Sequence, residues 1–370
     1  MHKISKILLT LSLGLSLTAC KKKSIKDKTT SVTNQQSKTK SNKTTSKKTN
    51  TIKPTTSKKD YSENYEKVGS TVYFGYYPQK LETDSSKISS IEELITPFSS
   101  TADAASKGWI KQVDYAGNAT REAYYYRDID LDKDGTNDYR AIHIYKYKNY
   151  NTSQTYDPSS VWWHDKEAFP EGSTYYFKYE KIKWSVLEEK DGKAYLFSSL
   201  ALDAMYYEDC TNDKTTKYSH NGGNGYANNY QLSEIRKWLN ETFYNLAFST
   251  KDKTIINQTT VKNGLSSTLD TSNDYVCNST DDFVYLLSEK EITTYYPTTE
   301  NRTYTKSILS DYAKIQDADY QKVLLRSPNK DRAYDIKYIA NESESSYGIV
   351  AYGSANYALY AIRPVIVITL

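Results

Sequence analysis

Aspartates alternate around a glycine between Asp130 and Asp138, in the pattern D-x-D-x-D-G-x-x-D. Carboxylates at positions 1, 3, 5 and 9 of such a loop can surround one Ca²⁺ ion, and the glycine allows the sharp turn. Position 12 is Ala141 rather than a bidentate glutamate, so Asp128 is the candidate for the missing ligand. A structural Ca²⁺ site and a plain acidic turn between strands both remain open. The candidate metal ligands are Asp130, Asp132, Asp134 and Asp138.

Cys20 follows a short, charged and then apolar N-terminal segment. Lys3 and Lys6 precede an apolar run over 7–17 that is too short to span a bilayer as a stable helix, which is typical of a secretory signal segment. The run ends in Leu-Thr-Ala-Cys, which resembles the bacterial lipobox, whose cysteine carries diacylglycerol on its sulfur and becomes the first residue after cleavage. We therefore expect a signal peptide at 1–19 and a lipidated Cys20 that anchors the protein on the extracellular side of the cell membrane.

Two further cysteines, Cys210 and Cys277, remain in the chain after Cys20. An even pair of cysteines in an exported protein can form a disulfide. Many secreted proteins of this kind also tolerate free thiols, so a Cys210–Cys277 bridge and two free cysteines are open alternatives.

The chain is rich in aromatic residues, with 37 Tyr and 5 Trp. Aromatic faces pack against the C–H faces of sugars, while their OH and NH tips form hydrogen bonds. Trp162 and Trp163 are neighbours with other aromatic residues nearby, and we expect them to form an exposed platform for a ligand. Trp184 and Trp238 fall inside a strand pattern and a helix pattern, so we expect them in the core.

Sequence signatures of common enzymes are absent, since there is no H-E-x-x-H, G-x-S-x-G or P-loop pattern. The histidines after the signal segment are His143, His164 and His220, and each has an ordinary interpretation in a strand or a loop. Binding without catalysis is therefore our first hypothesis. The alternative is an extracellular enzyme that acts on cell-wall or other polymers through carboxylates.

Charge divides the chain into two parts. Residues 21–60 hold 13 Lys and 2 Asp, whereas residues 61–370 hold 34 basic and 43 acidic residues. The first part cannot bury enough apolar surface to offset the entropy of ordering, so we expect a disordered tether over 20–60. The acidic body has no excess of positive charge to offer phosphates, which argues against nucleic-acid binding.

Short runs of β-forming residues, separated by turn residues, predict strands in the body. Helical spacing is clear over 235–246, where apolar residues recur at three and four and Ser233 can cap the helix. Ser288 and Glu291 form a capping box that predicts a second helix after a strand. Strands outnumber helices in a mixed order, which predicts an α+β fold with a mainly antiparallel sheet. The predicted strands cover 71–75, 141–145, 182–187, 194–197, 283–287 and 364–368.

Several separate segments of residues 72–370 resemble, in the right order, an uncharacterised domain family of secreted and surface proteins of Gram-positive bacteria. They include an opening Y-F-G-Y-Y-P-Q, a segment S-E-I-R-K-W-L-N and a segment L-R-S-P. The resemblance implies one domain over 61–370 with an insertion at about 85–170, and it implies no activity. The matching segments are 73–79, 176–187, 233–248, 282–288, 325–328 and 362–365.

The segments after residue 230 also resemble the C-type-lectin-like fold of the formylglycine-generating enzymes. In those proteins a helix precedes the core sheet, and an arginine-containing segment precedes a closing strand. The resemblance implies a C-type-lectin-like architecture only, because that fold hosts sugar binding, protein binding and an oxidative enzyme. The copper-holding cysteines of those enzymes lie near the C-terminal core, where this chain has neither Cys210 nor Cys277, so copper chemistry is not expected.

Arg236, Arg326 and Arg363 stand in the segments that carry the family resemblance. We expect them to be charges at the edge of the core, with Asp282 or Asp203 as partners. Arg326 is also a candidate ligand contact beside the tryptophan platform. Together these patterns predict a lipid-anchored protein whose folded domain binds a glycan or a protein at the cell surface.

Overall fold

The computed structural model describes the folded body of the chain. The described residues are 65–68, 70–112, 124–145, 172–209, 225–302, 308–316, 318–341, 348–357 and 359–370. Two compact units divide the chain, 1–56 and 57–370, and every described residue belongs to the second. Several predicted features lie outside the described residues, namely the signal peptide, Cys20, the tether, Trp162, Trp163 and Cys210. No helix in the described part of the chain is long and apolar enough to cross a membrane.

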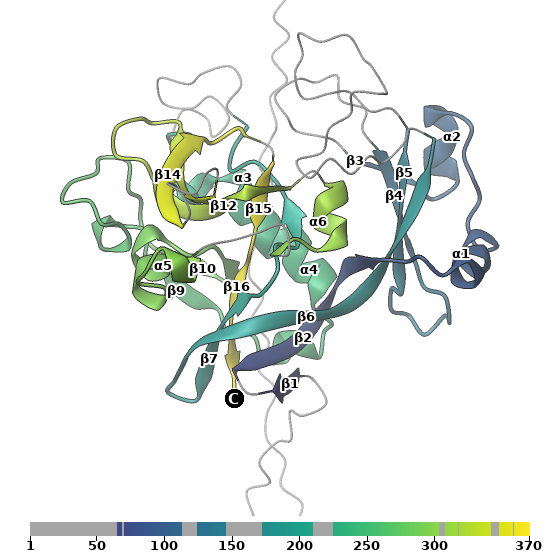
Figure 1. The fold of residues 1–370 in the computed structure, drawn as a ribbon, viewed down its shortest axis with the longest axis horizontal. Helices are drawn as coiled ribbons and strands as arrows, with labels where there is room; N and C mark the ends of the chain where they lie inside the picture. The colour runs from purple at the N-terminus through teal and green to yellow at the C-terminus, as the bar shows by residue number, and fades with distance from the viewer. Residues whose placement is uncertain are drawn as a thin grey trace, which may run out of the picture. The chain divides into compact units, whose positions relative to one another are not determined.

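The larger sheet has nine strands and is organised around β6, which is 17 residues long. Because β6 is so long, it pairs with β2 along one edge and with both β5 and β7 along the other, as Figure 1 shows. Phe177, for example, lies opposite Leu81 on β2 and opposite Arg140 on β5. The strands are β1 (Tyr65–Val68), β2 (Thr71–Leu81), β3 (Ile110–Gln112), β4 (Tyr124–Ile129), β5 (Tyr139–Ile144), β6 (Thr174–Lys190), β7 (Lys193–Ser198), β11 (Val284–Tyr285) and β16 (Val365–Thr369).

A second sheet has five strands in the order β14-β13-β12-β15-β8. All its pairs are antiparallel except β12 with β15, which run parallel. Its strands are β8 (Asp203–Ala204), β12 (Asp319–Pro328), β13 (Asp335–Ala340), β14 (Ile349–Ser354) and β15 (Tyr360–Ile362). A separate antiparallel pair is formed by β9 (Thr259–Val261) and β10 (Thr280–Asp282).

The predicted helix over 235–246 is present as three consecutive segments, the middle one a π-helix. The Ser233 side chain caps it by accepting from the Arg236 N–H, and both halves of the predicted capping box of Ser288 and Glu291 are present. The α- and π-helical elements are α1 (Ser85–Glu92), α2 (Thr101–Ser106), α3 (Glu234–Lys237), η4 (Trp238–Phe243), α4 (Tyr244–Ala247), α5 (Glu289–Tyr295) and α6 (Asp311–Ile315). Short 3-10 turns are η3 (Tyr230–Leu232), η5 (Asp252–Thr254), η6 (Leu265–Ser267) and η7 (Glu300–Arg302).

One predicted strand, 283–287, is much shorter in the structure, where β11 covers two residues. Asn240 and Arg326 explain the difference. Its Oδ1 accepts from the N–H groups of Phe283 and Val284 at 2.8 and 3.2 Å, and its Nδ2 donates to the Val284 carbonyl at 2.9 Å. Beyond β11, the Leu286 carbonyl accepts from the Arg326 guanidinium at 2.5 Å and the Leu287 carbonyl accepts from the Arg326 N–H at 3.0 Å. The backbone on either side of the two-residue strand therefore bonds to Asn240 or Arg326.

Among the described residues, two large hydrophobic cores support the sheets, and Tyr206 and Leu359 form a third, small cluster. The larger contains Trp184, which is fully buried as expected and donates from its indole nitrogen to the Phe74 carbonyl at 2.8 Å, whereas Trp238 lies half-buried at its edge. The smaller core is built by α1, α2, β4 and β5, all within the predicted insertion, with Trp109 and with Tyr176 of β6, and these helices and strands lie together in Figure 1. Arg140 reaches between the two cores, because it pairs with Asp128 and also donates to the Tyr312 hydroxyl at 3.1 Å.

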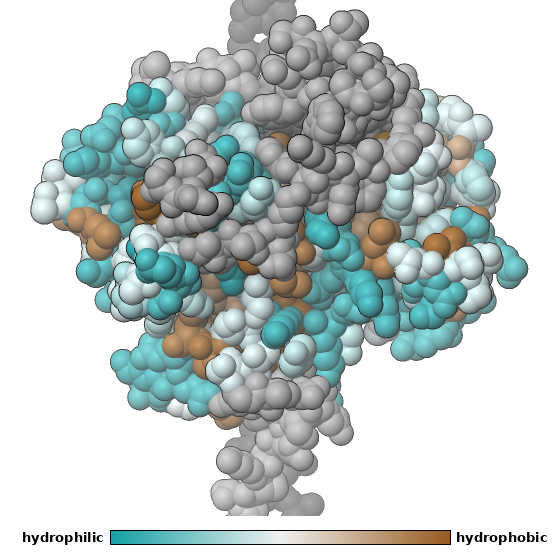
Figure 2. Space-filling view, viewed as in Figure 1, coloured by the Kyte–Doolittle hydropathy of each residue, from teal (hydrophilic) through white to brown (hydrophobic). Residues whose placement is uncertain are grey.

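The predicted α+β class is confirmed, with mainly antiparallel sheets and few helices. On the face shown in Figure 2, hydrophobic surface occurs as small separate patches among hydrophilic residues. The C-type-lectin-like architecture stays a prediction.

Candidate ligand-binding site

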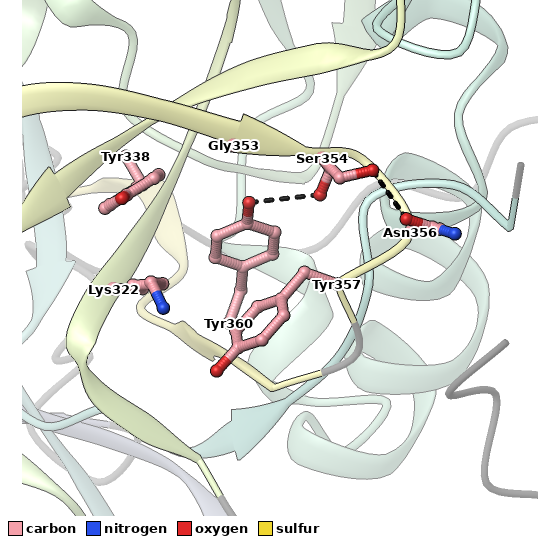
Figure 3. Close-up of a pocket in the computed structure, with 7 residues that line it drawn as sticks. All are labelled: Lys322, Tyr338, Gly353, Ser354, Asn356, Tyr357 and Tyr360. Atoms are coloured by element: carbon pink, nitrogen blue, oxygen red, sulfur yellow. Dashed lines mark hydrogen bonds between the residues drawn. The ribbon is translucent and has the colours of Figure 1, made fainter. Parts of the chain in front are cut away.

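A pocket of about 320 Å³ opens on the five-stranded sheet. Its lining combines three aromatic rings with a lysine and short polar side chains, as Figure 3 shows. The side chains come from β12, β13, β14 and β15 and from the turn between the last two. The lining residues are Lys322, Tyr338, Gly353, Ser354, Asn356, Tyr357 and Tyr360.

The pairing register explains why these residues meet. Residues two apart in a strand share a face, and directly paired residues of neighbouring strands do so too. Lys322 pairs with Ala340, which is two residues from Tyr338. Ile336, two residues further along, pairs with Gly353. Lys322, Tyr338 and Gly353 therefore lie on one face of the sheet.

The strand β15 and the turn before it complete the same side. Val323 pairs with Ala361, so these two residues occupy the opposite face and the adjacent Tyr360 lies on the pocket face. The turn between β14 and β15 adds Asn356 and Tyr357. Each strand thus contributes its lining residues through ordinary alternation.

Position 353 is a glycine, and two tyrosine side chains occupy the space that a larger side chain would need. A Cβ built on Gly353 would lie 2.7 Å from the Tyr360 hydroxyl oxygen and 3.1 Å from a ring carbon of Tyr338. Both tyrosines are buried, Tyr360 at 1% and Tyr338 at 6% exposure, and their rings are rigid. Any larger residue at position 353 would therefore push the rings apart and change the floor of the pocket.

The three tyrosine rings pack against one another. The Tyr360 ring centroid lies 5.0 Å from that of Tyr357 and 5.7 Å from that of Tyr338, within the range of favourable aromatic pairs. The Tyr360 hydroxyl donates to the Ser354 carbonyl at 3.0 Å, and the Ser354 hydroxyl donates to the Asn356 Oδ1 at 2.5 Å. Figure 3 shows both hydrogen bonds along the upper rim of the rings. The aromatic wall is therefore fixed before any ligand arrives.

One ion pair borders the pocket through Lys322. The Lys322 Nζ is 3.2 Å from the Asp319 Oδ2 and 4.6 Å from the centre of the Tyr357 ring. The Tyr357 hydroxyl donates to the same carboxylate oxygen at 2.8 Å, and Asp319 itself is fully buried. Asp319 thus holds both the lysine and the tyrosine in position.

The residues around this pocket match a known sequence family. A domain of unknown function, DUF6273, is found at residues 200–370. This finding confirms the expectation of an uncharacterised domain family for that part of the chain. No curated protein and no solved structure matches the chain.

The DUF6273 domain contains the whole five-stranded sheet, and with it every residue that lines the pocket. Of the nine-stranded sheet it contains only β11 and β16. The aspartate loop and the smaller core lie outside it, in residues that precede 200.

The aspartate loop brings three of its four predicted ligands together. Carboxylate oxygens of Asp130, Asp132 and Asp138 lie within 4.8 Å of one another. Backbone N–H groups shape the loop, since Gly135 donates to Asp130 at 2.8 Å. Asp134 instead accepts from the N–H and hydroxyl of Thr136 at 2.8 and 2.6 Å, and these bonds lower the pKa of its carboxyl.

Asp128 does not supply a further ligand to this loop. Its two carboxylate oxygens accept from the Arg140 guanidinium at 2.7 and 2.8 Å, and the Tyr179 hydroxyl donates to one of them at 2.9 Å. Arg140 lies on β5, the strand that follows the loop, and it is directly opposite Asp128 on β4 in the pairing of the two strands. The carboxylate is therefore committed to an ion pair.

Arg326 is not a contact for a surface ligand, and this corrects that expectation. The residue is 2% exposed, and all five guanidinium N–H groups have partners within the protein. Two of them go to the Glu291 carboxylate and the others to Asn263 and to the carbonyls of Lys262 and Leu286. Arg326 therefore acts as a buried structural charge, which is the other role considered for it.

The other two arginines of the segments that carry the family resemblance also make structural contacts. Arg236 pairs with Asp282 at 2.7 Å, as expected from the sequence. Arg363 donates to the Ser198 carbonyl at 2.9 Å and lies 3.9 Å above the Phe197 ring. Cys277 is half-buried, and with Cys210 outside the described residues the disulfide stays a prediction.

Sequence reasoning missed every residue of the pocket. The one available signal is the segment 352–360, where three tyrosines are separated by glycine, serine, alanine, asparagine and one leucine. This composition indicates a turn with aromatic side chains around it, which is a common setting for ligand contacts.

Proposed function

We propose that this protein is a lipid-anchored extracellular protein whose folded domain binds a surface glycan without catalysis, and that the tyrosine pocket is the binding site. The pocket on the five-stranded sheet is the observation that carries the proposal. Attachment to the membrane through Cys20 is part of the same proposal and rests on the N-terminal sequence alone.

The chemistry of the pocket suits a sugar. Sugar rings present C–H faces that pack on aromatic rings and hydroxyl groups that need hydrogen-bond partners. Tyr357 supplies a partly exposed ring with the buried rings of Tyr338 and Tyr360 packed behind it, while Lys322 and Asn356 bring polar groups to the same space. A volume of about 320 Å³ lies at the lower end of the range for small-molecule sites.

Calcium enters the proposal as a structural ion. The three converging carboxylates of the aspartate loop are oxygen ligands of the kind Ca²⁺ prefers. The loop belongs to the smaller core and not to the DUF6273 domain. We therefore assign a bound ion the role of stabilising that core, with no contact to the glycan.

The direct test is a binding experiment on residues 57–370, the second compact unit. The protein is screened on an array of bacterial and host glycans, and hits are measured by titration calorimetry. Tyr357→Ala removes a ring and the hydroxyl that binds Asp319, so we expect at least a tenfold loss of affinity, about 1.4 kcal/mol.

Tyr352→Ala is the matched control. Tyr352 lies next to Gly353 on β14, pairs with Lys337, and is 55% exposed on the other face of the sheet. Its removal is expected to leave affinity unchanged. Equal losses in both variants would place the glycan elsewhere, and Trp162→Ala would then test the tryptophan platform.

Three results would overturn the proposal. One is the absence of any glycan hit, with binding to a surface protein instead. The second is turnover of a bound polymer, which would favour the enzyme alternative. The third is affinity that does not change in Tyr357→Ala while the circular dichroism spectrum of the variant stays native.

A further inference from the structure

We infer that the pocket selects an uncharged sugar ring over its anionic counterpart. The inference rests on the proposed glycan-binding function and adds the charge class and size of the ligand. Its basis is the ion pair of Lys322 and Asp319, which lies next to the Tyr357 ring, together with the volume of the pocket.

Lys322 is the one ionised side chain that lines the pocket among the described residues, and its charge is already compensated. The Nζ lies 3.2 Å from the Asp319 Oδ2. An anionic group that approached this ammonium would also approach a carboxylate only a few ångströms behind it. The attraction and the repulsion largely cancel, so an anion gains little there and still gives up its hydration.

The ion pair is fixed and cannot open readily to admit an anion. Asp319 is fully buried and accepts from the Tyr357 hydroxyl at 2.8 Å and from the Gln321 N–H at 2.9 Å. Moving Lys322 away would leave this carboxylate buried without its cation, which is costly. The other polar groups of the lining are neutral, and neutral groups suit sugar hydroxyls.

The volume indicates how much of a glycan is recognised. About 320 Å³ is close to the smallest size of small-molecule sites, and the packed rings of Tyr338 and Tyr360 fix its floor. One sugar residue can occupy such a space, and the rest of a longer chain would extend out of the pocket. The site therefore fits a single neutral pyranose, at a chain end or as a side branch.

The experiment compares matched sugars on the wild-type protein. Methyl glycosides of glucose, galactose and mannose, and of their three uronic acids, are titrated into residues 57–370 at 20 and 300 mM NaCl. We expect at least one neutral sugar to bind ten times more tightly than its uronic acid. Its affinity should change less than twofold between the two salt concentrations, because no net charge is neutralised.

A preference for a uronic acid, weakened by salt, would overturn the charge inference and leave the glycan-binding proposal standing. Binding of long glycans with no binding of any single sugar would overturn the size inference alone. If neither sugars nor array glycans bind, the proposed function fails and the inference fails with it. These outcomes need no variant, so they do not depend on the folding of a mutant.

A charge change at Asp319 tests whether the Lys322–Asp319 ion pair causes the preference for neutral sugars. Asp319→Asn keeps the shape of the side chain and leaves the Lys322 ammonium uncompensated. We expect the affinity for the uronic acid to rise at least fivefold at 20 mM NaCl and to fall back at 300 mM. Asp103→Asn, in the half-exposed Lys107–Asp103 pair at 2.7 Å at the end of α2 and outside the five-stranded sheet, is the matched control and should change nothing. An unchanged preference in a natively folded Asp319→Asn would contradict the assigned role of the ion pair.

Discussion

Glu208 has a buried carboxyl group with one unpaired oxygen and a second carboxylate, Glu234, close by. It is 1% exposed, its Oε2 accepts from the Glu234 N–H at 2.7 Å, and its Oε1 has no partner. Burial first, and then repulsion by Glu234, raise the pKa of Glu208 to about 8 from its ordinary value of 4.5. The carboxyl is therefore protonated in the folded protein at neutral pH.

This protonation makes stability depend on pH. Between pH 4.5 and 8 the folded state keeps a proton that the unfolded chain has released, so the free energy of unfolding falls as pH rises. Asp203, whose pKa burial raises to about 6, adds the same effect between pH 3.8 and 6. We expect the free energy of unfolding to drop between pH 6 and 8 by at most about 2 to 3 kcal/mol. Urea unfolding across that range measures the drop.

Glu208→Gln is the variant that isolates the effect. An amide cannot release a proton, so the slope of stability against pH should flatten above pH 6. Glu93→Gln, an exposed position that follows α1, should leave the slope as it is in the wild type. A slope that persists in Glu208→Gln would assign the effect to another group.

Arg326 carries the second prediction at this scale. Arg326→Met removes five hydrogen bonds and leaves the half-buried Glu291 carboxylate and the carbonyls of Lys262 and Leu286 without their partner, so we expect a loss of roughly 3 to 5 kcal/mol in the free energy of unfolding. Arg332→Met is the control, because the Arg332 side chain is 55% exposed and its pair with Asp335 is long, at 3.6 Å. The control should lose less than about 1 kcal/mol. Chemical denaturation compares the two, and equal losses would contradict the structural role of Arg326.

At the scale of elements, the aspartate loop gives a test with metal. Ca²⁺ at one hundred times its dissociation constant should stabilise residues 57–370 by about 3 kcal/mol, and EDTA should remove the gain. Asp130→Asn should abolish the gain, since Asp130 belongs to the converging group. Asp134→Asn should retain most of it, because the Asp134 carboxylate faces Thr136. Thermal unfolding of each protein with Ca²⁺ and with EDTA measures the gain. A melting temperature that does not change with Ca²⁺ would show that the loop is a plain acidic turn.

Local signals predicted the elements better than they predicted the site. Ser233, Ser288 and Glu291 act at short range, and their capping bonds are present as expected. The strand at 283–287 is short because Asn240 bonds to the backbone at its start and Arg326 bonds to the carbonyls of Leu286 and Leu287 at its end, each from about forty residues away. The pocket is harder still, because Lys322, Tyr338 and Tyr360 each follow ordinary strand alternation and meet only through the pairing register.

At the scale of the whole molecule, the lipid anchor is the sharpest prediction. Cys20→Ala removes the sulfur that would carry the diacylglycerol. In cells fed a labelled fatty acid, the wild-type protein should become labelled and sediment with membranes. The variant should carry no label and leave the membrane fraction. Membrane association that persists in Cys20→Ala would show that the protein is held by other means.

The matched family region and the folded body have different boundaries. The DUF6273 domain begins at residue 200, but its strand β16 pairs with β7, which ends at Ser198. A fragment that begins at residue 200 would therefore expose an edge of β16 and lose Trp184 from the larger core. Binding experiments on the pocket should accordingly use the complete 57–370 unit.

The position of β16 also sets the timing of folding. This strand lies between β11 and β7, yet it is synthesised roughly 170 residues after β7. At about 5 to 20 residues per second, the ribosome needs roughly 8 to 35 s to make that stretch. During this interval β7 has an unpaired edge, the kind of edge that recruits other chains. A chaperone that holds the nascent chain open until residues 365–369 have emerged would therefore raise the yield of native protein.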